Sequence, residues 1–420
     1  MYSLVIAWVL LFPLLFFVAR GTVSFDRTST LGAAEGDAIT DSRPDSAYYR
    51  AEQILVYAVV AALIVPSIPG LTSVISENLL ILSLPCLALL SAFWTQSPQK
   101  TIPFGVFAIA LTVFGIYLSM RFSPERQIDL FLFVGWAAII LSFLAVLFFP
   151  NAGIQPNDSH GAWRGMFILK NHMGEVMTLL IYAAFCVKPK NSLQRVALGL
   201  YILLASVLVI MSQSRTCWIL LALSLCFAAY LKILSKIRGQ ERILLTGALA
   251  VILLIVAGVS VAYASEIAVF LGKDPTLTGR TKIWGAVATV LWKRPLLGFG
   301  YRAFWLGLKG ESLNLALAVG STSLVNSENA IFEIWLELGV VGVILMLLPL
   351  FQACRNAITC LRHDSPAYVH WFILIVFFNV VALIDGGKIM FPHTIEWLLF
   401  VMAYVGLSAE ARRVRSRQTA

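Results

Sequence analysis

Long apolar runs separated by short polar stretches fill most of this 420-residue chain. A helix that crosses a bilayer upright needs ~20 consecutive apolar residues, and about twelve of the runs approach that length. We therefore predict an all-α, polytopic membrane protein with about 12 transmembrane helices. The runs lie near residues 3–19, 53–68, 79–95, 103–120, 128–149, 174–187, 196–213, 216–235, 243–264, 330–351, 368–385 and 393–409.

Composition supports a single membrane bundle. Hydrophobic residues make up 59% of the chain and charged residues only 13%, whereas soluble domains carry about 25% charged residues. The first run lacks a basic leading region and a small-x-small cleavage site, so we expect a retained span rather than a signal peptide. We see no repeat of 20–50 residues, which argues against transporters built from inverted repeats.

Lysine and arginine predict the orientation. The net charge of +9 has an ordinary cause in basic residues that flank spans, so we expect no nucleic-acid partner. With twelve spans, the side that holds both termini carries 15 basic residues in short loops and tail, and the opposite short loops carry 5. Positive residues mark the cytoplasmic side, which places both termini inside and residues 20–52 and 265–329 outside. The 15 are Arg121, Arg126, Lys188, Lys190, Arg195, Lys232, Lys236, Arg238, Arg242, Arg355, Arg362, Arg412, Arg413, Arg415 and Arg417.

These expectations divide the chain into four parts. Residues 1–264 form about nine membrane helices, 265–329 a large periplasmic loop, 330–410 about three further membrane helices, and 411–420 a basic cytoplasmic tail.

One segment of the large loop is predicted to be helical. From Thr281 to Trp292, apolar residues recur at helical spacing and Pro295 follows the end. Such a helix is too short to cross a membrane but can lie along its surface. The apolar positions are Ile283, Val287, Val290 and Leu291.

Cationic residues gather at the predicted outer face. Arg164, Lys170 and Asn171 precede the sixth run, Arg215 occupies a tight turn, and Arg280 precedes the short helix. A single arginine at a span end is commonly a headgroup anchor, but several on one face favour an anion site. ATP and nucleotide sugars are absent outside the cell, so the expected anion is a lipid phosphate or pyrophosphate, which arginine binds in a bidentate manner.

Carboxylates accompany the tenth run in "SENAIFEIWLELGVVG". Glu328 and Asn329 stand at its mouth, and Glu333 and Glu337 enter its body, where a carboxylate is costly unless it faces the bundle interior or a wet cavity. Asn329 and the latter two share one helix face. For Glu337 we favour a structural pairing inside the bundle, whereas Glu333 stays open between structure and function. The glycines Gly339 and Gly342 are expected to let helices approach closely.

Other residues have weaker claims. His160, His172 and His393 near the outer face are alternative bases, and Asp385 with Lys388 is an ion pair or part of an acceptor groove. Tryptophans at 284, 292 and 305 stack on sugars or anchor the interface. The six cysteines lack metal-site spacing.

Five motifs in order carry a family resemblance: "WTQSPQKT", "WRGMFILKNHMG", "SQSRT", "GRTKIWGAVATVLWKRPLLGFGYRAF" and "SENAIFEIWLELGVVG". Over roughly residues 80–410 the chain resembles the O-antigen ligase and Wzy-type polysaccharide polymerase superfamily. It is most similar to the exopolysaccharide polymerase branch, through Trp163-Arg164-Gly165, Lys170-Asn171 and Gly174.

The resemblance implies a GT-C-like glycosyltransferase in the bacterial inner membrane, with its active site facing the periplasm. Such enzymes take an undecaprenyl-pyrophosphate-linked glycan as donor and need no nucleotide sugar, metal or other cofactor. Arg215 and Arg280 match the arginines assigned to the donor pyrophosphate. Where the family has His-Asn, this chain has Glu328-Asn329, so Glu328 becomes the candidate base. Implied partners are the lipid-linked donor and acceptor, membrane lipids, a chain-length regulator and export proteins.

The implied chemistry is displacement at the anomeric carbon. Fixed cations stabilise charge on the departing pyrophosphate while a base removes the proton of the attacking hydroxyl. Two sister activities use the same donor, namely transfer of finished glycan to lipid A core by a ligase, and protein O-glycosylation. A transporter or flippase for a lipid-linked glycan is a separate alternative, which predicts symmetric halves and broken helices at the midplane.

Overall fold

The computed structural model describes residues 2–19, 47–156, 161–234, 237, 241, 280–306, 310–320, 326–327, 329–363, 368–382 and 394–419. Within these ranges the secondary structure is helical, apart from one isolated bridge between Ile154 and Trp163. The predicted all-α class is confirmed for this part of the chain.

The helices, with their bounds, are α1 (Tyr2–Ala19), α3 (Ala47–Ile64), η1 (Val65–Ser67), α4 (Ile68–Ser76), α5 (Leu80–Leu90), η2 (Ser91–Phe93), α6 (Pro98–Arg121), α7 (Pro124–Phe148), α8 (Pro150–Gly153), α9 (Lys170–Cys186), α10 (Ser192–Met211), α11 (Arg215–Leu234), α14 (Arg280–Leu291), α15 (Gly310–Val319), α16 (Ala330–Leu361), α17 (Tyr368–Ala382) and α18 (Ile395–Thr419).

Each predicted run that falls inside the described ranges is helical, and the run at 243–264 lies outside them. Among the described residues, five helical stretches are long and apolar enough to cross a membrane, and shorter apolar helices accompany them. The polytopic architecture is therefore supported, whereas the count of twelve spans stays a prediction. The five stretches are Ala51–Ser76, Pro98–Arg121, Pro124–Phe148, Ser192–Met211 and Ala330–Leu361.

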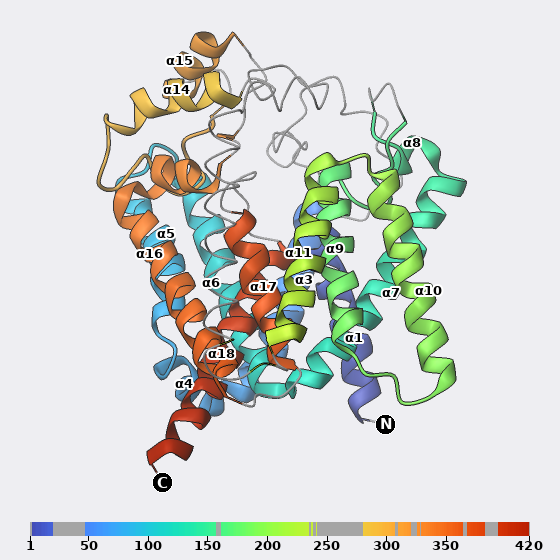
Figure 1. Ribbon diagram of the computed structural model, residues 1–420. Helices are drawn as coiled ribbons and strands as arrows, with labels where there is room; N and C mark the ends of the chain where they lie inside the picture. The colour runs from blue at the N-terminus through green and yellow to red at the C-terminus, as the bar shows by residue number, and fades with distance from the viewer. Residues whose placement is uncertain are drawn as a thin grey trace.

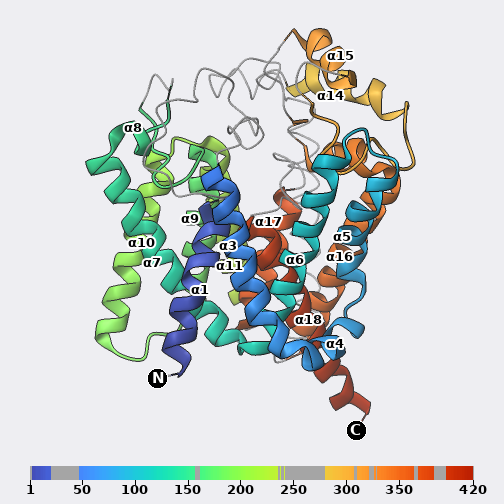
Figure 2. The same ribbon diagram turned by 180° about the vertical axis from the view of Figure 1, so that it is seen from behind.

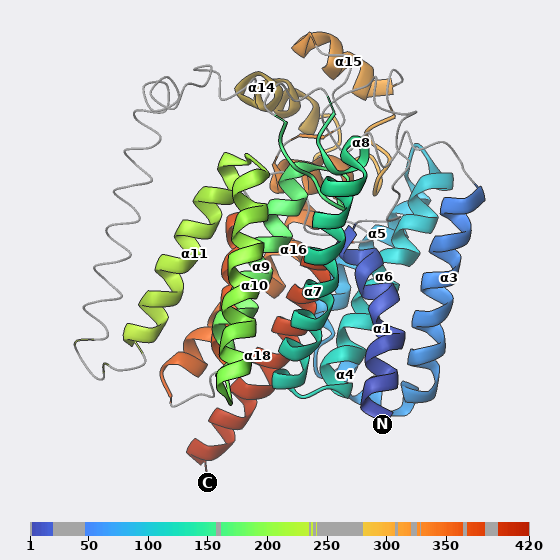
Figure 3. The ribbon, with the colours of Figure 1, turned by 90° about the vertical axis from the view of Figure 1, so that its right-hand side faces the viewer.

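The long helices stand side by side in one bundle with two distinct ends (Figures 1 and 2). Both chain termini lie at one end, which we call the terminal end. Helices α8, α14 and α15 lie at the other, which we call the loop end, and the side view agrees (Figure 3). Both termini therefore share one side of the bundle, as predicted.

Helix α18 is the central element of the bundle. It packs against α6, α16 and α17, and nearly every residue from Ile395 to Leu407 is buried, as expected for a helix that is hydrophobic all round. Gly406 lets α17 come close, since a Cβ there would lie 2.3 Å from Phe372 Cε2.

Some polar groups inside the bundle form hydrogen bonds between helices. Trp397 donates its indole N–H to Thr112 Oγ1 at 2.8 Å, and the Tyr182 hydroxyl donates to the Leu220 carbonyl at 3.1 Å. Hydrocarbon offers no water to satisfy such groups, so these bonds specify which helices are neighbours.

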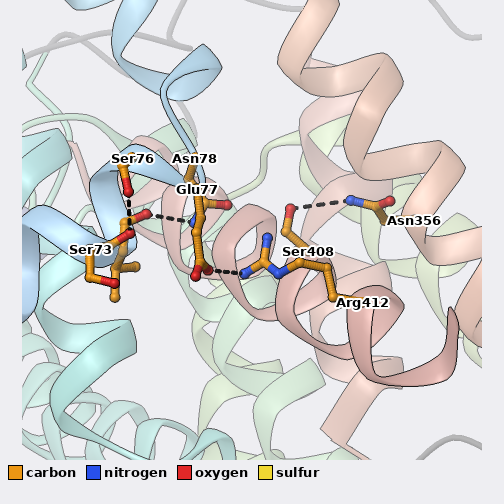
Figure 4. A network of polar contacts seen from close by, with 8 residues as sticks. Ser73, Ser76, Glu77, Asn78, Asn356, Ser408 and Arg412 are labelled. Carbon is orange, nitrogen blue, oxygen red and sulfur yellow. Dashed lines mark hydrogen bonds and ion pairs between the residues drawn. The ribbon is translucent and has the colours of Figure 1, made fainter. Parts of the chain in front are cut away.

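At the terminal end, α18 continues as a helix through Thr419, so the predicted basic tail extends α18. Arg412 forms an ion pair with Glu77, which follows α4, at 2.7 Å. One turn earlier, Ser408 accepts a hydrogen bond from Asn356 of α16 at 3.2 Å (Figure 4). These contacts tie the last turns of α18 to two neighbouring elements.

The short helix predicted in the large loop is confirmed as α14. Its predicted apolar positions Ile283, Val287, Val290 and Leu291 are all buried. They form a small core with Phe304, Trp305, Leu315 and Leu336. This face is therefore covered by protein rather than by the membrane surface, contrary to the sequence-based expectation.

Candidate functional site

The first turns of α9 and α11 meet at the loop end of the bundle. Lys170 begins α9 and Arg215 begins α11, and Cys217 Sγ donates to the Asn171 carbonyl at 3.3 Å. Gly174 permits this approach, because a Cβ there would lie 2.6 Å from Cys217 Sγ. Asn171 and Arg215 are exposed and Lys170 is half-buried, so three predicted site residues share one surface.

Arg164, which precedes α9 in the chain, is only 1% exposed. Its Nε donates to the Ala152 carbonyl at 2.8 Å and its Nη2 to the Asn151 carbonyl at 3.2 Å. Both carbonyls belong to the short α8 and need partners of this kind. Burial lowers the pKa of Arg164 to about 10, so the guanidinium is still charged at neutral pH. Its contacts in the structure hold the backbone, and its role toward substrate stays a prediction.

The start of α16 forms a second part of the loop end. Asn329 is the N-cap of α16, and its Oδ1 accepts from the Ile331 and Phe332 N–H groups at 3.0 and 3.2 Å. Glu328 lies outside the described residues, although its neighbours Ser327 and Asn329 are within them. Arg280 is the first residue of α14, and only its backbone is described.

Glu333, one turn into α16, is 4% exposed and accepts hydrogen bonds on both carboxylate oxygens. Its Oε1 accepts from Trp305 Nε1 at 2.5 Å, and its Oε2 accepts from the Ser327 N–H at 2.9 Å. Trp284 of α14 donates its indole N–H to the Ser327 carbonyl at 3.0 Å. These contacts favour the structural interpretation of Glu333, and any role in the reaction stays a prediction. Trp305 and Trp284 serve as hydrogen-bond donors in this structure, a role that the sequence analysis missed.

Helix α16 is broken at Gly339, whose φ is 69° and ψ −171°. The segment 295–300 covers the break. The Phe299 and Gly300 N–H groups donate to the Leu336 and Glu337 carbonyls, each at 2.8 Å, and the Val340 N–H donates to the Pro295 carbonyl at 2.8 Å. A Cβ on residue 339 would lie 2.0 Å from the Leu296 carbonyl oxygen. The expectation that Gly339 serves helix–helix approach is therefore wrong, because it admits a backbone segment instead.

The same segment also binds the start of α6 and the residues before it. Trp94 Nε1 donates to the Leu297 carbonyl at 2.9 Å, and Thr101 Oγ1 donates to the Tyr301 carbonyl at 2.8 Å. Two motifs about 200 residues apart, "WTQSPQKT" and "RPLLGFGYR", are thus in contact. Next in the chain, Arg302 places its guanidinium 5.3 Å from the centre of the Phe104 ring. Arg302 was not singled out by the sequence.

Of the remaining candidate histidines, only His172 lies in the part of the chain that the structure describes. His172 is buried, with Nε2 3.8 Å from Glu396 Oε1 of α18. His160, His393, Asp385 and Lys388 lie outside the described residues. Among the residues that are described, no three His, Cys, Asp or Glu side chains are grouped as metal ligands would be.

Two comparisons with known proteins fit this arrangement. Residues 200–347 match the O-antigen ligase family, and this stretch includes Arg215, Arg280, Glu328 and Glu333. The exopolysaccharide production protein ExoQ of Rhizobium meliloti (strain 1021) is 30% identical over 274 residues. The aligned part covers 63% of this chain and 62% of that relative. These matches support the O-antigen ligase and Wzy-type polymerase superfamily, and the similarity to ExoQ supports its exopolysaccharide branch.

Proposed function

We propose that this protein is a membrane glycosyltransferase that polymerises undecaprenyl-pyrophosphate-linked oligosaccharide repeat units into exopolysaccharide or O-antigen. The observation that carries the proposal is the exposed Arg215 beside Lys170 and Asn171 at the loop end. It lies within the region that matches the O-antigen ligase family. A cationic surface of this kind suits an anionic lipid pyrophosphate.

In the proposed reaction, an acceptor sugar hydroxyl attacks the anomeric carbon of the donor glycan. The bond between that carbon and the pyrophosphate oxygen breaks, and undecaprenyl pyrophosphate departs with the bonding electrons. Arg215 and Arg280 stabilise the charge that develops on the departing group, which lowers the barrier electrostatically. The N–H groups at the start of α14 favour an anion in the same way.

Glu328 is the proposed general base, and it takes the proton of the attacking hydroxyl as the new glycosidic bond forms. A carboxylate performs this task in inverting glycoside hydrolysis. The neighbouring Asn329 contributes by capping α16, which fixes the backbone on one side of Glu328. We propose that the reaction proceeds without a metal ion or other cofactor.

The proposed location is the bacterial inner membrane, with the loop end facing the periplasm. Support comes from the basic residues of the terminal end, since Arg412, Arg413 and Arg417 of α18 are exposed there and positive residues mark the cytoplasmic side. At the periplasmic face, a chain-length regulator and export proteins are the proposed protein partners.

A ligase is the second candidate, favoured by the name of the matched family. It would use the same donor and the same arginines but transfer finished glycan to another acceptor. The transporter alternative predicts broken helices, and α16 is one. However, the polar groups at its break that face segment 295–300 are occupied by that segment, so the break offers no separate ligand site there.

Deletion of the gene in its own host separates these candidates. Loss of all polymer, with single repeat units accumulating on the lipid carrier, is the expected result. Polymer that persists on its lipid carrier would point to a ligase, and single repeat units trapped on the cytoplasmic side would point to a flippase.

A further inference from the structure

Three hydrogen bonds centred on Glu333 and Ser327 join four parts of the loop end. Glu333 of α16 binds Trp305 of the segment after α14, and it binds the backbone of Ser327. Ser327 in turn binds Trp284 of α14. Together these bonds hold α14, Trp305 and Ser327 against the first turn of α16.

The surroundings of Glu333 fit an anchor and not a reacting group. Ser327 is 0% exposed, Trp305 is 7% exposed, and Glu333 itself is 4% exposed. A buried carboxylate is stable only when its oxygens are hydrogen-bonded, and here both oxygens accept from N–H groups. A general base, by contrast, needs a lone pair within reach of the acceptor hydroxyl.

We propose that Glu333 is a positioning residue, which sets the backbone on either side of residue 328 and the placement of α14 relative to it. Asn329 completes the arrangement, because its carbonyl accepts from Ser327 Oγ at 2.8 Å while its side chain caps α16. The inference rests on the proposed function for its kinetic consequence. A shift of about 1 Å in a catalytic group can cost 10²-fold in rate.

The test uses Glu333→Gln, which keeps the shape but replaces one acceptor oxygen by an amide N–H donor. Both of these hydrogen bonds to the Glu333 carboxylate come from N–H donors, so the amide NH₂ of glutamine must face one of them. Trp305→Phe removes one of these N–H groups. In the double variant, the amide oxygen can accept from Ser327 while the amide nitrogen faces the phenyl ring.

For Glu333→Gln we expect kcat per folded enzyme to fall by about 10- to 100-fold, with the donor KM within twofold of wild type. The pH dependence of kcat should keep its shape, because the proton acceptor is unchanged. The double variant should be more active than Glu333→Gln alone. Glu311→Gln is the matched control, since Glu311 lies on α15, pairs with Lys293 and has no part in the network; it should keep wild-type kcat.

Hydrogen exchange provides a readout that does not depend on activity. A peptide spanning residues 321–332 should exchange faster in Glu333→Gln and recover partly in the double variant, with α10 unchanged. A wild-type kcat in Glu333→Gln would overturn the inference. So would a kcat loss in the double variant that equals the product of the two single-variant losses, or an unchanged exchange rate of the peptide in Glu333→Gln. An inactive wild-type enzyme would instead contradict the proposed function, and the exchange result would still decide whether Glu333 fixes the segment.

Discussion

Arg215 is the residue on which the proposed donor site depends most. It begins α11 and is exposed at the loop end, where a bidentate guanidinium can hold two pyrophosphate oxygens. Arg215→Lys keeps the charge but loses the planar fork, so we expect most polymer to be lost at normal expression, as for Arg280→Lys. The measurement is polymer yield and chain length by gel electrophoresis.

Arg195→Lys is the control for this substitution. Arg195 is also exposed in the first turn of a helix, α10, but at the terminal end of the bundle. It should leave polymer unchanged. If Arg215→Lys keeps wild-type yield and chain length, Arg215 anchors the helix at the lipid headgroups and does not hold the donor pyrophosphate.

Glu328 is tested by exchanging its basic oxygen. Glu328→Gln should lower the rate by about 10²–10⁴-fold if the carboxylate removes the acceptor proton, whereas Glu328→His, which supplies another base, should retain part of the activity. Turnover of purified lipid-linked repeat units is the measurement. Glu311→Gln is the control, because Glu311 lies on α15 and pairs with Lys293, apart from the proposed site. Near-normal turnover by Glu328→Gln would exclude it as the base.

At the scale of single residues, the sequence predicts which side chains stand at the ends of apolar runs. Lys170, Asn171 and Arg215 each stand at the predicted mouth of an apolar run, and the structure brings them to one surface. The partners of Glu333 could not be predicted, since Trp305 lies 28 residues away and nothing in local spacing joins an indole to that carboxylate. Arg164 matched a motif, yet its observed partners are backbone carbonyls that only the fold brings near.

Among the elements, α16 has the strictest residue requirement, because its break needs glycine at position 339. Gly339 has a φ of 69° with ψ of −171°, a region of backbone space that is almost restricted to glycine and costs other residues about 1–3 kcal/mol. Gly339→Ala would also press its Cβ against the Leu296 carbonyl. We expect a lower thermal midpoint in detergent and reduced activity, because segment 295–300 must move.

Gly199→Ala serves as the control for Gly339→Ala. Gly199 lies inside α10, and a Cβ there would meet nothing within 4 Å. Alanine should therefore be neutral, or should stabilise the helix by up to about 1 kcal/mol. If both alanine variants have the same midpoint as wild type, the break does not depend on glycine.

Element prediction succeeds where hydrophobic periodicity determines the outcome. The described spans and α14 were predicted because long apolar runs must form helices in a bilayer and because α14 has a regular apolar stripe. The break in α16 was missed, since its apolar pattern continues across Gly339 and the compensating hydrogen bonds come from residues 295–300. The surface placement of α14 failed for a related reason, as its apolar face is covered by residues distant in sequence.

For the whole molecule, orientation in the membrane is the first property to test. Ala318 of α15 is exposed at the loop end and Ser416 of α18 is exposed at the terminal end, whereas Ser312 is buried and would label poorly. In a variant without native cysteines, Ala318→Cys should react with an impermeant thiol reagent in intact spheroplasts. Ser416→Cys should react only after lysis. The reverse pattern would invert the proposed orientation and place the site on the cytoplasmic side.

The measurement that tests the central claim most directly is product analysis with purified protein in liposomes. The liposomes contain undecaprenyl-pyrophosphate-linked repeat units as the sole glycan, in buffer with EDTA and without nucleotide sugars. We predict a ladder of lipid-linked products that differ by one repeat unit, together with released undecaprenyl pyrophosphate, and little of either from Arg215→Lys. Correct folding of that variant is checked by its thermal midpoint. Repeat units that stay unextended beside a wild-type protein of native stability, or that extend only when a second acceptor class is added, would contradict the polymerase assignment.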